Sequence, residues 1–200
     1  LFARDDQPII PPEHQSIFDA VRAGKSIDDV AVLTGKTAEA IRDILVEVRV
    51  RRLKALPIHY IYNREFELPT ADETILTNVV ADEDGAVRQI RPPKDLPPYL
   101  QDLYRQPLLS PQQEKAHFRT YNYLKYKAER MRQGVDPLNI SIELLDKTEA
   151  LLAAADRVKN DILKANLRLV VSIARRHVGR APQFFEIVSD GNLSLMRAVE

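Results

Sequence analysis

Cysteine and tryptophan are absent from this 200-residue sequence, and glycine is scarce, with 6 residues. Without cysteine, neither a disulfide framework nor a thiolate metal site is possible. The 4 histidines are scattered, and no pair has metal-ligand spacing, so no metal or cofactor is expected. No apolar run approaches the roughly 18 residues that suggest a membrane span. The N-terminus lacks a secretory pattern, so a cytoplasmic protein is the default expectation. The histidines are His14, His59, His117 and His177.

Charge is balanced overall, with 29 basic and 29 acidic side chains, but it is unevenly distributed. Acids outnumber bases over residues 65–95, whereas bases prevail over 105–132 and 157–180. Segregation of this kind can turn a basic face toward nucleic acid or an acidic protein surface. The alternative is a set of solvated helix faces. No nucleophile–base pair or phosphate-binding loop is present, so no enzymatic activity is expected.

Residues 16–53 predict three short helices. Ser26 and Thr37 are suited to cap the second and third, and glycines follow the first two. Val30, Gly35 and Ile41 fit the spacing of a helix-turn-helix. This motif leaves three roles open for the region: DNA binding, protein docking or a structural role. If it binds DNA, the outward contacts are Lys36, Thr37, Glu39 and Arg42.

Residues 64–96 predict a linker, because they combine many acids with Pro69, Pro92 and Pro93. Beyond it, Ser110 and Gln113 predict a capping box at the start of a helix that ends near Gly134. A long helical pattern then runs from 141 to about 178. A last helix is expected from about 184, after a break at 179–182.

The stretch 165–177 (ANLRLVVSIARRH) predicts an amphipathic helix whose aliphatic residues pack in a core. Asn166 is the exception, since asparagine is unfavourable inside helices and indicates a specific contact. Together with 183–200 (QFFEIVSDGNLSLMRAVE), this stretch resembles region two of the housekeeping, sigma-seventy class of bacterial RNA polymerase sigma factors. The resemblance implies that the helices dock on a coiled coil of the largest subunit of the polymerase core.

Positions matched to that family predict a polymerase-binding stripe at helical spacing. It mixes apolar residues with acids and an amide, which suits a partner better than a dry core. The alternative for Phe185 and Met196 is simple core packing. The sequence departs from the family pattern at Ser189, Asp190 and Ser194, where side chains are shorter. The stripe comprises Phe185, Glu186, Ser189, Asp190, Asn192 and Met196.

The stretch 98–114 (PYLQDLYRQPLLSPQQE) resembles region one-point-two of the same family, which contacts the single-stranded non-template strand of promoter DNA. The resemblance also implies a pocket for a flipped base near the minus-ten element. Tyr99 could instead be a buried aromatic, and Glu114 a plain surface acid. Pro97 and Gln101 stand where the family often has arginine. The implied promoter-binding residues are Tyr99, Leu100, Gln101, Glu114, Asn166 and Leu169.

The sequence thus predicts an all-α protein with a helix-turn-helix-like domain (1–63), a linker (64–96) and an incomplete sigma-type domain (97–200). Its expected function is to bind RNA polymerase core and direct promoter recognition and transcription initiation. The alternative is a helix-turn-helix regulator that acts without polymerase. Because the chain starts on Leu1 and stops within an apolar-periodic run, we expect the protein to continue beyond Glu200.

Overall fold

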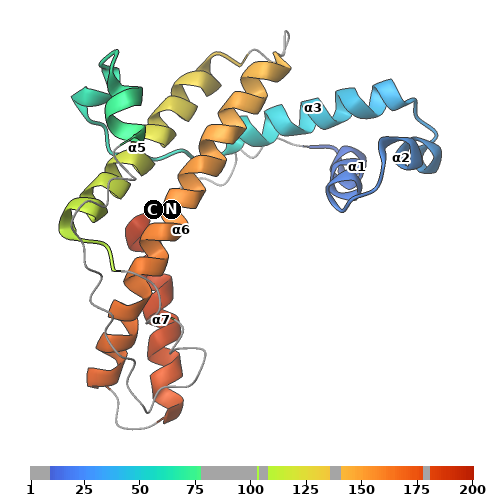
Figure 1. Ribbon diagram of the computed structural model, residues 1–200. Coiled ribbons are helices and arrows are strands. Elements are labelled where there is room, and N and C mark those ends of the chain that lie inside the picture. Colours follow the sequence, from blue (N-terminus) through green and yellow to red (C-terminus); the bar gives the residue numbers. More distant parts are fainter. Residues whose placement is uncertain (1–9, 78–102, 104–107, 136–140, 178–180) are drawn as a thin grey trace, which may run out of the picture. The chain divides into compact units, whose positions relative to one another are not determined.

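The regular elements are helices, as predicted. A computed structural model of the chain describes residues 10–77, 103, 108–135, 141–177 and 181–200, and no strand occurs among them (Figure 1). None of the helices in these ranges has the length and apolar content needed to cross a membrane. The chain divides into two compact units, one of Leu1–Ile58 with Lys127–Leu151 and one of His59–Tyr126 with Leu152–Glu200. The division into three domains at 63 and 96 stays a prediction.

The first unit begins with helices α1 (Pro12–Arg22), α2 (Ile27–Thr34) and α3 (Ala38–Ala55). Helix α1 starts earlier than the sequence suggested, because proline is accepted in the first helical turn. Ser26 and Thr37 cap α2 and α3 as predicted, and Gly35 ends α2 in the left-handed conformation. The helices share a small apolar core of Ile17, Val30, Ile41, Ile44 and Val48.

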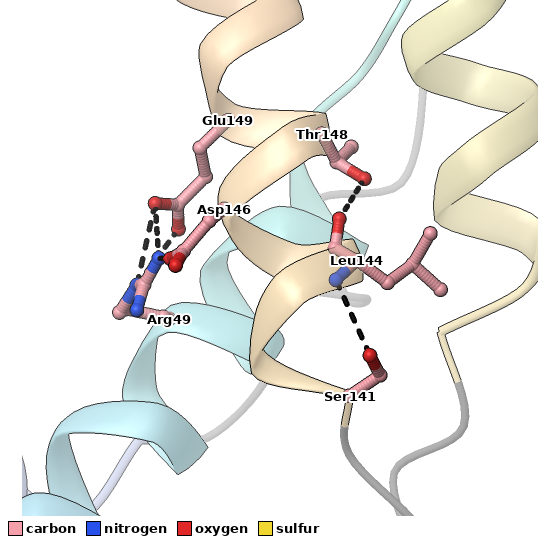
Figure 2. Close-up of polar contacts among 6 residues, drawn as sticks. All are labelled: Arg49, Ser141, Leu144, Asp146, Thr148 and Glu149. Atoms are coloured by element: carbon pink, nitrogen blue, oxygen red, sulfur yellow. Dashed lines mark hydrogen bonds and ion pairs between the residues drawn. The ribbon is translucent and has the colours of Figure 1, made fainter.

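Two arginines connect α3 to the later helices of the same unit. Arg49 forms a forked contact with Glu149 of α6 (Ile142–His177), with Nη2 2.7 Å from Oε2, and it also contacts Asp146 (Figure 2). The hydrogen bonds to Glu149 are the main reason why the pKa of Arg49 lies above its usual value. Arg132, near the end of α5 (Pro111–Gln133), donates to the carbonyl of Leu53 at 3.2 Å. Arg132 also donates to the Lys54 carbonyl at 3.5 Å, and it thereby supplies a donor at the end of α3, where the last carbonyls lack intrahelical partners.

The start of α6 shows how local sequence sets a helix boundary. The Leu144 N–H donates to Ser141 Oγ at 3.3 Å, and the hydroxyl of Thr148, which is fully buried, donates to the Leu144 carbonyl at 2.7 Å (Figure 2). The predicted capping box of α5 is confirmed as well. Gln113 N–H donates to Ser110 Oγ at 3.2 Å, and Ser110 N–H donates to Gln113 Oε1 at 2.7 Å.

The first part of the predicted linker is folded, which corrects the expectation for residues 64–77. They form a 3-10 turn, η1 (Arg64–Glu67), and a π-helical turn, η2 (Asp72–Leu76). Phe66, Ala71 and Ile75 are buried in a cluster with Tyr123 of α5. Apolar burial therefore outweighs the acidic, proline-bearing composition. Residues 78–96 lie outside the described ranges.

Polar contacts reinforce this packing of η1 and η2 on α5. The buried Thr120 hydroxyl donates to the Ile75 carbonyl at 3.1 Å. Tyr123 donates to Asp72 Oδ1 at 2.7 Å. Just before η1, residues 57–63 form neither a helix nor a strand, and the Ile61 N–H donates to Asn122 Oδ1 at 2.7 Å.

Helix α7 (Ala181–Val199) begins three residues before the predicted start near 184 and includes Pro182 in its first turn, where proline is tolerated. It packs against α6 at Gly191, where an added Cβ would lie 2.5 Å from Val170 Cγ1. Phe184 also packs on the buried Val171 of α6. These contacts decide which face of α7 is covered.

Candidate functional site

The six residues of the predicted polymerase-binding stripe lie on α7, away from its packed face. Val188 and Val199 are buried, whereas Phe185 is 42% exposed and Met196 46% exposed. Glu186, Ser189 and Asp190 are also exposed, and Asn192 is half-buried. Core packing therefore does not account for Phe185 and Met196.

A further apolar side chain on this surface, Leu193, was not among the residues predicted from the sequence. Leu193 is 51% exposed and lies one helical turn from Ser189 and from Met196 or Arg197. A helical-wheel reading could have found it, since Leu193 is three and four positions from these residues. The surface formed by Phe185, Leu193 and Met196, with the acids Glu186 and Asp190, is hereafter the α7 face.

The structure brings together the three residues predicted for the base pocket. Asn166 Nδ2 donates to Glu114 Oε1 at 3.4 Å, joining α6 to α5. The same amide nitrogen donates to the Ile162 carbonyl at 3.0 Å. Leu169, one turn farther along α6, is 52% exposed. Asn166 therefore makes a side-chain contact with a neighbouring helix, and an exposed aliphatic side chain lies one turn from this polar pair.

The remaining predicted promoter contacts, Tyr99, Leu100 and Gln101, lie outside the described residues. The basic, aromatic segment of α5 is mainly core. The side chains of Tyr121, Tyr123 and Leu124 are buried, with 5%, 4% and 5% of their surface exposed. Lys125 lies over the Tyr121 ring at 4.5 Å. These three side chains therefore contribute to the packing of the helix and do not form an exposed stacking platform for nucleic acid.

Two of the four helix-turn-helix residues have structural roles. Thr37 caps α3 by accepting from the Ala40 N–H at 3.2 Å, and Lys36 pairs with Glu13 of α1 at 3.0 Å. Glu39 and Arg42 are exposed on α3. Of the four residues, only Arg42 therefore presents an exposed positive charge to a ligand, and the negative charge of Glu39 on the same helix balances it.

Comparison with known proteins finds sigma factors. The RNA polymerase sigma factors RpoD of two Helicobacter pylori strains are each 43% identical over 58 residues, which is 29% of this chain and 9% or 8% of those proteins. The RNA polymerase sigma factor SigA4 of Synechococcus elongatus is 34% identical over 102 residues, which is 51% of this chain and 30% of that protein. No family model and no solved structure matches the chain.

The matches thus span less than a third of the length of these relatives. Within that part, the names of the relatives agree with the family inferred from the motifs in 98–114 and 165–200. The all-helical architecture agrees with it too. The resemblance of this chain to the housekeeping class of bacterial RNA polymerase sigma factors is therefore confirmed over part of its length.

Proposed function

We propose that this chain binds the RNA polymerase core and takes part in promoter recognition and transcription initiation. The observation that carries the proposal is the α7 face, where large apolar side chains remain exposed beside acids on a well-packed helix. Exposed aliphatic and aromatic side chains grouped with charges are typical of a protein-binding surface. The similarity to sigma factors supports the core polymerase as the partner.

The chemistry of the α7 face also indicates the kind of surface it fits. Phe185, Leu193 and Met196 supply apolar area, and Glu186 and Asp190 supply carboxylates. Carboxylates beside an apolar strip suit a helix that carries arginines, because guanidinium groups form paired hydrogen bonds with carboxylates. Because of the resemblance to sigma factors, we propose that this helix belongs to the coiled coil in the largest polymerase subunit.

A positive charge introduced on α7 tests the proposal. We expect Asp190→Arg or Asn192→Arg to weaken binding to purified core polymerase at least about tenfold, because a mispaired interfacial charge costs several kcal/mol. Ala198→Arg is the matched control, since Ala198 is exposed on the same helix but lies outside both the stripe and the α7 face. Binding is measured by competition for core against a labelled sigma factor.

Equal affinity of all variants, with thermal unfolding unchanged, would contradict the assignment. The alternative function, a helix-turn-helix regulator acting without polymerase, predicts a different pattern. It requires tight, salt-dependent binding of the chain to duplex DNA and no binding to core. The same competition assay, repeated with duplex DNA in place of core, separates the two functions.

We also propose that Glu114, Asn166 and Leu169 form part of a pocket for an unstacked base of the non-template strand. A carboxylate and an amide can read the edge of a base while an aliphatic side chain packs on its face. The bonds from Asn166 Nδ2 to Glu114 and Ile162 engage the amide donors. The acceptors of the pair therefore remain for the base, and the pocket should favour a base edge that presents an N–H donor.

This pocket is tested with a single-stranded minus-ten oligonucleotide and the chain bound to core. Asn166→Ala should weaken oligonucleotide binding about fivefold or more, in the range of one lost base contact. Asn160→Ala is the control, because Asn160 is an exposed asparagine of the same helix. Equal effects of the two substitutions, with core binding intact, would remove Asn166 from the pocket.

A further inference from the structure

Helix α2 exposes two aliphatic side chains that its own domain does not cover. Val32 is 83% exposed and Leu33 68% exposed, although Val30 of the same helix is 2% exposed. Short helices of small domains usually keep such residues in the core, and an adjacent pair left in water indicates a binding surface.

Carboxylates border this apolar pair. Asp28 precedes Val32 by four positions and Asp29 precedes Leu33 by four, so each acid lies one helical turn from an exposed aliphatic residue. Both acids are themselves exposed. We name these four residues, Asp28, Asp29, Val32 and Leu33, the α2 face.

Exposed acids also outnumber exposed bases in the first two turns of the following helix. On α3, Glu39 and Asp43 are exposed beside Arg42, while Lys36 is paired with Glu13. Among the exposed residues of 25–43, four are acids and two, Lys25 and Arg42, are bases. Phosphates would therefore meet more carboxylates than cations in this segment, which opposes DNA binding there. A partner that brings lysines or arginines next to aliphatic side chains would match both the apolar pair and the acids.

From this complementarity we propose that the α2 face is a docking surface for a protein segment with aliphatic residues flanked by basic ones. The segment lays its aliphatic side chains on Val32 and Leu33 and its cations beside Asp28 and Asp29. Of the three roles that the helix-turn-helix motif leaves open, the geometry points to protein docking. The proposal does not depend on polymerase binding through the α7 face.

The test uses the whole chain and a synthetic helical peptide with leucines along one face and flanking lysines. A matched peptide carries glutamate in place of every lysine, and a short DNA duplex is the third probe. Fluorescence anisotropy should show binding of the lysine peptide, no binding of the glutamate peptide, and weaker binding of the duplex. Leu33→Lys should weaken peptide binding at least about tenfold.

Two further variants test the separate contributions of charge and apolar contact to peptide binding. Asp28→Asn should weaken binding less than Leu33→Lys and reduce its salt dependence, because it removes a charge and keeps the apolar contact. Ile142→Lys is the control, since Ile142 is 54% exposed on α6 and receives the same new charge. It should leave peptide binding unchanged within about twofold, a change well below the loss of one apolar contact.

Because Val32 and Leu33 are exposed, Leu33→Lys should not change thermal unfolding, so a loss of binding cannot be attributed to misfolding. The inference is overturned if the lysine peptide does not bind, if Ile142→Lys weakens it as much as Leu33→Lys, or if the duplex binds more tightly than the peptide. Core polymerase binding should be unaffected by Leu33→Lys. A failure of this inference is therefore distinguishable from a failure of the proposed function.

Discussion

Replacing Gly191 by alanine introduces one methyl group at the closest approach of α7 to α6. The new Cβ would lie 2.5 Å from Val170 Cγ1, well inside van der Waals contact. Val170 is 8% exposed and sits in a helix, where a β-branched side chain has one strongly preferred rotamer. The valine therefore cannot turn aside, and the two helices must separate.

Two opposing effects set the size of the change. Overpacking a core by one carbon costs about 1–3 kcal/mol, whereas alanine is more favourable than glycine inside a helix by about 0.8–1 kcal/mol. We therefore expect Gly191→Ala to lower the free energy of unfolding by about 0–2 kcal/mol, the difference between these terms. Removing the obstructing methyl groups with Val170→Ala should make the alanine at 191 acceptable.

A double-mutant cycle measured by urea unfolding tests this reasoning. The cost of Gly191→Ala should fall by about 1 kcal/mol or more in a Val170→Ala background, because the steric term disappears. Gly134→Ala is the control, since its Cβ would meet neighbours no closer than 3.4 Å. A stabilised Gly191→Ala variant, or a cycle without coupling, would show that the helices are not in close contact at this point.

Three further substitutions test contacts that shape the fold. Arg49→Ala should cost about 1 kcal/mol, less in high salt, because the contact is partly exposed; urea unfolding at two salt concentrations measures this. Arg132→Ala should cost about 1 kcal/mol by uncapping α3, with faster hydrogen exchange at the end of that helix. Burial and the hydrogen bond to Asp72 raise the pKa of Tyr123. Stability should therefore fall above pH about 10, where the unfolded state ionises first, and fall less in Tyr123→Phe.

Helix boundaries were predictable where a local signal marks them. The caps at Ser26, Thr37 and Ser110 and the glycine at 35 depend on hydrogen bonds and backbone conformations within a few residues. Such interactions are encoded in adjacent residues, so the sequence alone is enough to locate them. The start of α7 was placed too late because Pro182 was read as part of a break, although proline is accepted in a first turn. The start of α1 was also placed too late, since that helix begins at Pro12.

The fold of residues 64–77 was not predictable from the same kind of reasoning. Their composition is typical of a linker, and nothing local marks η1 or η2. What orders them is the contact of Phe66 and Ile75 with Tyr123, which lies about fifty residues farther along the chain. Propensity and capping rules contain no information about contacts at that separation, so the outcome depended on tertiary packing.

Helical periodicity in the sequence shows which residues of a candidate site share a face, but it does not show whether that face is exposed. Helical spacing groups Phe185 with Met196 on one stripe, but spacing alone is equally compatible with a core stripe facing inward. The close contact at Gly191 shows that the stripe faces outward, because the opposite side of α7 packs against α6. On α2, spacing is still less informative, since Val32 and Leu33 follow the buried Val30 within a continuous apolar run. Only the packing of the three N-terminal helices shows that this pair faces water, and this is why the α2 face emerges from the structure and not from the sequence.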